Sequence, residues 1–325
     1  MVEQEFSLKS YERPWLVTGG AGYVGGHVIQ ELINAGIPVV SVDLDENSAL
    51  EKFSNEIMFQ RCDIRNKYLL KSVFNDFNFE GVIHLAALKS VEDSESNQAD
   101  YYETNVIGTK NILELMVEYN IHKMIYSSSA AVYEAKSGSK LVSEESPLNP
   151  VSFYGKTKLD AEKLIEQYYK SNEISSVIFR YFNVAGSADY KLKDKSIQNL
   201  IPITINRIRK GESPEIFGDD YETVDGTGIR DFVDVRDIAK AHVNAIDYLE
   251  KKTNYLVLNI GTGIGYSVKQ VIDLVQEILE TNFEPKIKAR RAGDISAITA
   301  DCTKARYLIG FESKYNIREM IETSI

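Results

Sequence analysis

The sequence has few residues of the types that cross-link small secreted proteins or hold metal ions. Only two cysteines, Cys62 and Cys302, and four histidines occur among its 325 residues, and they are scattered along the chain. Neither a disulfide scaffold nor a zinc site is therefore expected. No apolar run approaches the about 18 residues that a membrane-spanning helix needs, and the polar segment 1–13 lacks the apolar centre of a signal peptide. We therefore expect a cytoplasmic protein with no membrane segment and no bound metal.

Positive charge is also scarce. The formal net charge of -11 at pH 7 argues against a general nucleic-acid-binding protein. An anionic ligand would then need a local cationic pocket. The apolar content of 43% is that of a globular enzyme, and a chain of this length has room for about two domains.

Short apolar runs alternate with helical patterns along most of the chain. We expect strands at residues 14–18, 37–42, 57–62, 82–86, 123–127, 176–181 and 255–260. The helices are expected at 23–34, 101–119, 152–171, 200–210, 235–250 and 268–279. This alternation predicts an α/β fold with a doubly wound parallel sheet (a Rossmann fold), which binds ligands beyond the carboxyl ends of its strands.

The alternation breaks after Asn183, and the last expected strand returns to the sheet. We therefore predict a cofactor domain and a smaller, discontinuous C-terminal substrate domain. The cofactor domain would comprise residues 1–183 and about 232–261, and the substrate domain residues 184–231 and 262–325.

A glycine-rich turn follows the first expected strand. Gly19, Gly22 and Gly25 form the pattern Gly-x-x-Gly-x-x-Gly directly before a helical pattern. Glycine permits a tight turn and lets a pyrophosphate approach the N–H groups at a helix N-terminus. Asp43 ends the next strand, where its carboxylate would accept hydrogen bonds from the adenosine ribose and repel a 2′-phosphate. The segment therefore predicts a site for NAD.

A tyrosine and a lysine, Tyr154 and Lys158, stand four residues apart in a segment with a helical pattern. In a helix this spacing places both side chains on one face. A phenol with a pKa of about 10 is a poor base at pH 7, and we expect the nearby ammonium to lower that pKa. Tyr154 could then take a proton from a sugar hydroxyl while a nicotinamide takes the hydride.

The glycine pattern and the Tyr-x-x-x-Lys pair together resemble the extended short-chain dehydrogenase/reductase superfamily. Longer blocks narrow this resemblance to the UDP-glucose 4-epimerase family, and the similarity runs from Trp15 to about Ile321. The blocks are Thr18-Gly-Gly-Ala-Gly-Tyr-Val-Gly25, His84-Leu-Ala-Ala-Leu-Lys-Ser-Val91, Ser127-Ser-Ser-Ala-Ala-Val-Tyr133, Arg180-Tyr-Phe-Asn183, residues 217–231 and Arg290-Arg-Ala-Gly-Asp294.

The resemblance implies an isomerase that interconverts UDP-galactose and UDP-glucose through a 4-keto sugar with tightly retained NAD. Tyr154 would be the acid and base, Lys158 would tune it and hold the nicotinamide ribose, and Ser129 would bind the 4-oxygen of the sugar. The other residues implied to contact NAD are Gly19, Gly22, Tyr23, Val24, Gly25, Asp43, Asp63, Ile64, Leu85, Ala86, Ala87, Lys89, Asn105 and Phe182. Besides Ser129 and Tyr154, the residues implied to bind the UDP-sugar are Lys89, Asn183, Asn199, Leu200, Phe217, Arg230, Arg291 and Asp294.

Arg230 and Arg291 would supply the cationic pocket that an acidic protein needs for a diphosphate. The resemblance also implies a homodimer formed through the helices at 101–119 and 152–171. No nucleic acid or membrane partner is expected.

Three positions depart from the family pattern. Glu134 stands where a glycine is common, and Asp234 where a histidine is frequent. Ile298 occupies the place where a tyrosine tends to exclude N-acetylated sugars and smaller residues admit them. UDP-N-acetylglucosamine or a UDP-pentose therefore stays open as an alternative substrate.

Two other functions are less consistent with the motifs. A nucleotide-sugar 4,6-dehydratase needs a further acid/base pair after the serine, where Ala130 and Ala131 stand. An NAD sensor without catalytic activity would not need Ser129, Tyr154 and Lys158 together.

Overall fold

A seven-stranded sheet forms the centre of the computed structural model, which describes residues 13–44, 48–134, 141–291 and 294–325. Its strand order is β11-β7-β5-β4-β1-β2-β3, and every neighbouring pair is parallel. The strands are β1 Trp15–Thr18, β2 Val39–Asp43, β3 Met58–Arg61, β4 Gly81–His84, β5 Lys123–Ser129, β7 Ser175–Tyr181 and β11 Tyr255–Ile260. The predicted doubly wound sheet is confirmed, including the return of the last strand.

Helices cover both faces of this sheet. Alternate residues of one strand enter different cores, so that Val17 packs with one face and Leu16 with the other. The first core contains buried residues of α1 Tyr23–Asn34 and α9 Val235–Leu249. The second contains residues of α3 Lys67–Asp76, α6 Gly108–Glu118 and α7 Phe153–Asn172. From β1, the chain adds β2 and β3 on one side and then continues with β4 on the other side, so the strand order reverses between β1 and β4. Ligands of such sheets bind at this switch point.

The helix predicted over residues 101–119 is present as an unbroken helical run, but a π-helical turn that was not predicted divides it into three pieces. These are α5 Gln98–Tyr102, the π-helical turn η1 Glu103–Ile107 and α6. The π-turn contains Asn105, whose side chain reaches two other segments. π-Helical turns often mark functional sites, and a sequence period does not reveal them.

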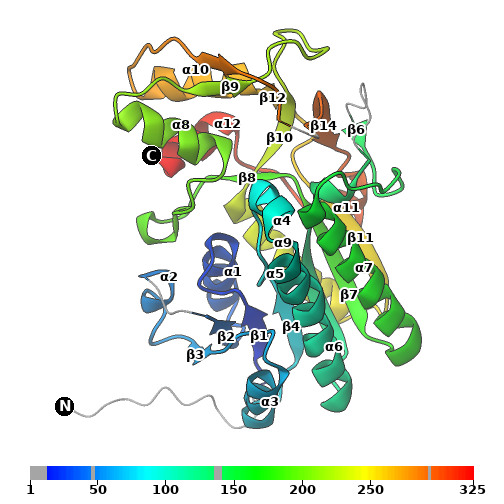
Figure 1. Cartoon of the computed structure of the whole chain (residues 1–325). Coiled ribbons are helices and arrows are strands. Elements are labelled where there is room, and N and C mark those ends of the chain that lie inside the picture. The colour runs from blue at the N-terminus through cyan, green and yellow to red at the C-terminus, as the bar shows by residue number, and fades with distance from the viewer. Residues whose placement is uncertain (1–12, 45–47, 135–140, 292–293) are drawn as a thin grey trace, which may run out of the picture.

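A smaller layer lies above the large sheet in Figure 1. It contains the sheet β12-β10-β14-β6, with β8 beside β10, and the pair β9 and β13. Its strands are β6 Leu141–Val142, β8 Asn183–Ala185, β9 Glu215–Phe217, β10 Ile229–Asp234, β12 Gly265–Ser267, β13 Lys286–Lys288 and β14 Ala297–Ala300. The helices α8 Leu200–Arg209, α10 Val268–Ile278 and α12 Ile317–Ser324 share a third core.

Short elements connect these layers. They are α2 Ser48–Glu51, α4 Val91–Ser96, η2 Ala130–Val132, η3 Tyr190–Leu192 and α11 Thr303–Ile309. β6 pairs with β14, and α11 packs against α9 and β11. Each of these contacts joins a segment of the predicted cofactor domain to one of the predicted substrate domain. The exact division into two domains stays a prediction.

Candidate active site

The glycine turn lies at the carboxyl end of β1, beside the switch point of the sheet. Gly19 has a φ of +76°, and a Cβ there would lie 2.6 Å from the backbone nitrogen of Ala86. A Cβ on Gly25 would lie 2.1 Å from the carbonyl oxygen of Gly19. No side chain caps the N-terminus of α1, which follows this turn. These residues fit a dinucleotide, since backbone N–H groups at an uncapped helix end can bind a pyrophosphate.

Asp43 lies at the end of β2, next to the glycine turn. Its Oδ2 accepts a hydrogen bond of 2.9 Å from the N–H of Ala21. The carboxylate is therefore held at the edge of the turn, where a ribose of a bound dinucleotide would lie.

The loop Leu85–Lys89 follows β4 and is held by Asn105. The Asn105 side chain accepts from the N–H of Leu88 at 2.9 Å and donates to its carbonyl oxygen at 3.0 Å. It also donates to the hydroxyl of Thr157 at 3.0 Å. Asn105 is 1% exposed, so its side chain fixes the loop relative to α7.

Ser129, Tyr154 and Lys158 come together where β5 ends and α7 begins. Burial raises the pKa of Tyr154 to about 12, and a hydrogen bond with the Ser129 side chain opposes this shift. The Lys158 Nζ donates to the carbonyl oxygen of Ser127 at 2.8 Å and lies 6.0 Å from the centre of the Tyr154 ring. Burial lowers the pKa of Lys158 to about 7, against the attraction of Glu162.

The predicted lowering of the Tyr154 pKa is wrong for the ligand-free chain, because the pKa lies near 12. The loss of water around the phenol outweighs the other interactions. A base form of Tyr154 therefore has to arise in the complex with ligands.

A buried ion pair below Lys158 was missed by the sequence reasoning. Arg180 donates to both carboxylate oxygens of Glu162, at 3.0 and 2.6 Å, and both side chains are 3% exposed. Ser128 also donates to Glu162. The spacing of Glu162, four residues after Lys158, was the available signal. The partner on β7 could not be identified from spacing.

The residues implied to bind UDP lie in the smaller layer, and several pair with each other or with neighbours. Arg230 forms an ion pair with Asp294. The Arg291 guanidinium stacks on Phe217, with 4.0 Å between its carbon and the ring centre. The Asn199 side chain donates to Asp194, another residue missed by the sequence reasoning, at 2.9 Å.

Asp194 also links the smaller layer to the loop after β4. Its carboxylate lies 3.6 Å from the Nζ of Lys89. Lys89, implied to contact both NAD and the UDP-sugar, and Asn199, implied to bind the UDP-sugar, therefore share one carboxylate.

The remaining implied residues lie in several elements of both layers. Phe182 and Ile64 are buried, and Asp63 forms an ion pair with Arg65. Asn183 begins β8 and Leu200 begins α8. Tyr23 and Val24 form the first turn of α1.

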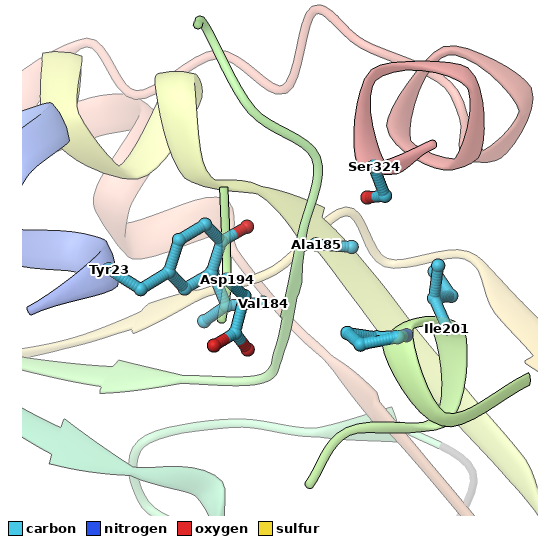
Figure 2. A pocket seen from close by; sticks show the side chains of 7 residues that line it. Tyr23, Val184, Ala185, Asp194, Ile201 and Ser324 are labelled. Carbon is cyan, nitrogen blue, oxygen red and sulfur yellow. The ribbon is translucent and has the colours of Figure 1, made fainter. Parts of the chain in front are cut away.

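Figure 2 shows a small cavity beside Tyr23. Its volume is about 30 Å³, and it is lined by Tyr23, Val184, Ala185, Asp194, Ile201, Pro202 and Ser324. The Tyr23 hydroxyl donates to the carbonyl oxygen of Gly186 at 2.5 Å. The cavity is large enough for about one water molecule but not for a sugar.

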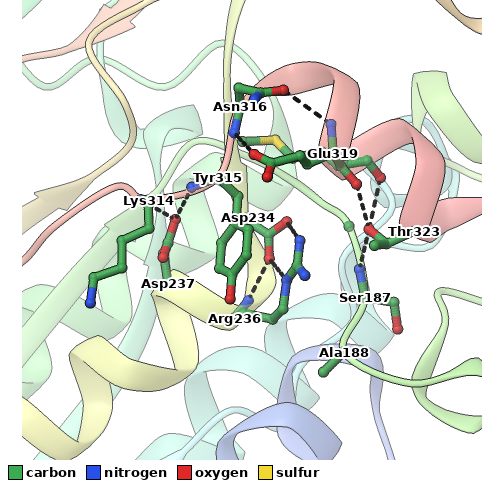
Figure 3. Close-up of polar contacts among 12 residues, drawn as sticks. Ser187, Ala188, Asp234, Arg236, Asp237, Lys314, Tyr315, Asn316, Glu319 and Thr323 are labelled. Carbon is green, nitrogen blue, oxygen red and sulfur yellow. Dashed lines mark hydrogen bonds and ion pairs between the residues drawn. The ribbon is translucent and has the colours of Figure 1, made fainter.

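Asp234, one of the departures from the family pattern, has a structural role. It is fully buried, caps α9 and accepts from the Nε and Nη2 of Arg236, both at 2.8 Å. The Arg236 guanidinium stacks on Tyr315, 3.4 Å from the ring centre (Figure 3). In Glu134 the backbone N–H donates to Pro147 at 2.9 Å.

Ile298 lies on β14 directly opposite Arg230 of β10 and is 8% exposed. Its side chain therefore neighbours a residue implied to bind the substrate. Within the described ranges, no cluster of histidine, cysteine or acidic residues could hold a metal ion, and no helix is suited to cross a membrane.

Known proteins resemble the chain over nearly its whole length. The model of the NAD dependent epimerase/dehydratase family matches residues 15–261. A UDP-glucose 4-epimerase of Dictyostelium discoideum is 38% identical over 319 residues, covering 94% of this chain and 92% of that protein.

Solved structures agree with these sequence matches. UDP-glucose 4-epimerase of Stenotrophomonas maltophila, with bound NAD and formylated UDP-arabinopyranose, has a TM-score of 0.90 and 31% identity, covering 96% of this chain and 97% of that one. The enzyme of Bifidobacterium longum, in complex with NAD+ and UDP, has a TM-score of 0.88 and 36% identity, covering 96% of both chains.

Proposed function

The chain belongs to the NAD dependent epimerase/dehydratase family, and on this premise we propose that it is an NAD-dependent isomerase that interconverts UDP-galactose and UDP-glucose. The observation that carries the proposal is the convergence of Ser129, Tyr154 and Lys158 at the carboxyl end of β5, on the edge of the sheet that also carries the uncapped glycine turn. This arrangement provides a proton acceptor for a sugar hydroxyl next to a dinucleotide site.

Bound NAD supplies the acceptor and later the donor of the hydride at carbon 4, so that the reaction is redox-neutral. Gly19, Gly25 and Asp43 would hold its pyrophosphate and adenosine ribose, and Lys158 its nicotinamide ribose.

Tyr154 takes the proton of the 4-hydroxyl and returns it to the 4-oxygen after the keto sugar has turned over. Ser129 holds that oxygen and, through its hydrogen bond to the phenol, favours the charged form of Tyr154. In its protonated form, Lys158 adds positive charge on the same helix face. These residues prepare the phenol for proton transfer.

Arg230 and Arg291 would bind the diphosphate, far from the reacting carbon. Such binding holds the nucleotide firmly and leaves the sugar free to present either face. Arg230 already faces an acidic partner in Asp294, so its guanidinium is oriented toward an anion.

A second candidate is the epimerisation of a UDP-N-acetyl sugar, which the isoleucine at position 298 favours. A UDP-pentose is a third substrate, and the formylated UDP-arabinopyranose in a related epimerase supports this alternative. Ala130 and Ala131 form the helical turn η2 after Ser129 and offer no acid/base pair for a dehydratase.

The homodimer also belongs to the proposal. α6 and α7 pack side by side, and a groove between them is lined by Glu114, Val117, Gln167, Tyr168, Ser171 and Asn172. Light scattering of the purified protein tests this assembly: a monomeric mass contradicts it. The cytoplasmic location stays a prediction.

The decisive experiment is an assay of purified protein with UDP-galactose and saturating NAD. Formation of UDP-glucose supports the proposal, and unchanged UDP-galactose contradicts it. Parallel assays with UDP-N-acetylgalactosamine and a UDP-pentose distinguish the three substrates, and an absorbance scan shows whether the protein retains NAD during purification.

A further inference from the structure

The first turn of α7 carries Tyr154, and two of its N–H groups are capped by side chains of another helix, α4. Ser152 supplies the usual cap, because its hydroxyl accepts from the N–H of Gly155 at 3.0 Å. The N–H of Phe153 donates to the carboxylate of Glu95 at 2.8 Å. Helix N-termini leave four such donors, which usually bind their own cap or water.

A further such donor is the N–H of Tyr154 itself. It binds the hydroxyl of Ser94 at 3.0 Å. Ser94 is fully buried, and its own hydroxyl donates to the carbonyl oxygen of Val91 at 2.6 Å. Both hydrogen-bonding roles of this serine are therefore fixed, and α4 holds the backbone of the proposed acid/base residue.

α4 continues directly from the loop that is implied to contact NAD. Ser90 follows Lys89 and caps α4. The Tyr101 hydroxyl donates to the carbonyl oxygen of Ser90 at 2.7 Å, which ties the start of α4 to α5. One short stretch of chain therefore connects the cofactor loop to the N–H of Tyr154.

We propose that Ser94 and Glu95 are positioning residues that set the direction of the Tyr154 phenol relative to the cofactor loop. This inference rests on the proposed epimerase function. When a reacting group is displaced by about 1 Å, the rate can fall about a hundredfold. Two hydrogen bonds from α4 limit such a displacement in the first turn of α7.

The test compares Ser94→Ala with Ser96→Ala in the NAD-loaded protein. Ser96 lies on the same helix, and its exposed hydroxyl bonds to Asp93 and to the side chain of Asn97, not to α7. We expect Ser94→Ala to lower kcat about tenfold or more while KM for UDP-galactose stays within about twofold, and Ser96→Ala to keep both. The inference is overturned if Ser94→Ala keeps the wild-type kcat, or if only its KM for UDP-galactose rises.

The pH dependence of kcat separates positioning from a general loss of stability. The hydrogen bond with Ser129 lowers the pKa of Tyr154. A misdirected phenol would lose this bond, and its pKa would rise. The midpoint assigned to Tyr154 should therefore move to higher pH in Ser94→Ala. An unchanged midpoint contradicts a positioning role.

Glu95 permits a conservative rescue. Glu95→Gln keeps a carbonyl oxygen as acceptor for the N–H of Phe153, whereas Glu95→Leu removes it. We expect the glutamine variant to keep the wild-type kcat and the leucine variant to lose activity. Equal losses in both variants overturn the proposed acceptor role.

Hydrogen exchange gives a measurement that does not depend on the reaction. Amides of residues 153–157 should exchange faster in Ser94→Ala than in Ser96→Ala, and equal exchange contradicts the hydrogen bond to Tyr154. If the wild-type protein leaves UDP-galactose unchanged while this difference is present, the proposed function fails and the contact between α4 and α7 stands.

Discussion

The two sides of the candidate site are held in different ways. On the redox side, the Lys158 Nζ donates to the backbone of β5, and the N–H of Tyr154 donates to the buried hydroxyl of Ser94. On the nucleotide side, Arg230 pairs with Asp294, and Asn199 pairs with Asp194. The redox side is therefore preorganised, whereas the nucleotide side has to exchange protein partners for a ligand.

This difference agrees with the demands of a 4-epimerase. Proton transfer needs the same fixed geometry in every catalytic cycle. A sugar that rotates in the site, in contrast, has to be held firmly only through its nucleotide. Exposed ion pairs contribute about 0–1 kcal/mol, so the exchange of the partly exposed Arg230–Asp294 pair for a diphosphate costs little. Substitutions on each side should therefore change different measured quantities.

Loss of the phenol should have the largest effect. We expect Tyr154→Phe to lower kcat by about 10²–10⁴, because no other group takes the proton of the 4-hydroxyl. NAD should stay bound, since the change removes one hydroxyl. Steady-state assays and the absorbance of bound NAD measure both, with the exposed Tyr102→Phe as the matched control. Wild-type activity in Tyr154→Phe contradicts the assigned base.

On the nucleotide side, Arg230→Ala should weaken UDP binding and leave the redox machinery intact. A hydrogen bond to a charged group contributes about 1.5–3 kcal/mol, so we expect the Kd of UDP to rise about tenfold to a hundredfold. Calorimetric titration with UDP measures this change. Arg318→Ala, which breaks an ion pair with Glu277 on α10, is the control. An unchanged Kd in Arg230→Ala removes Arg230 from the site.

Preorganisation of the redox side should reduce stability near neutral pH. The pKa of Lys158 falls from 10.5 to about 7 on burial. Between these values the unfolded chain binds a proton that the folded chain lacks, so stability rises with pH across this window and the full penalty applies below pH 7.

Lys158→Met should therefore raise the free energy of unfolding of the ligand-free protein at pH 6.5, by about 1–2 kcal/mol. The gain should shrink toward pH 10, where the wild-type penalty disappears. Urea unfolding at pH 6.5 and 9.5 measures the difference. An equal effect at both pH values rules out the buried ammonium as its cause.

Local spacing was sufficient to propose part of the redox side. The glycine turn, Asp43 and the pair Tyr154 and Lys158 each depend on residues close in sequence or on the end of one strand. The seven strands of the large sheet also followed from the alternation of apolar runs with helical patterns. The roles of Ser129 and of the nucleotide-side residues came from the family resemblance alone.

Contacts between distant segments could not be predicted. Ser94 lies 60 residues before Tyr154, and no periodicity links them. The raised pKa of Tyr154 depends on burial, which one sequence window does not reveal. The π-turn around Asn105 has the apolar pattern of an ordinary helix. Arg180 on β7, the ion-pair partner of Glu162, can be identified from the fold but not from the sequence spacing.

The smallest effect concerns the choice of sugar. Ile298 is buried opposite Arg230 on the neighbouring strand, so a larger side chain there should crowd the surroundings of a residue implied to bind the substrate. We expect Ile298→Tyr to lower turnover of UDP-N-acetylgalactosamine relative to UDP-galactose by about tenfold, in the range that pocket volume gives. Competition assays with both sugars measure the ratio, and Ile298→Val, which frees volume, should not lower it. A ratio that stays constant in Ile298→Tyr places the selection of the acyl group elsewhere in the nucleotide layer. Failure of the tyrosine variant on UDP-galactose as well would mean that β10 and β14 couple the redox side to the nucleotide side, so that the two are not independent.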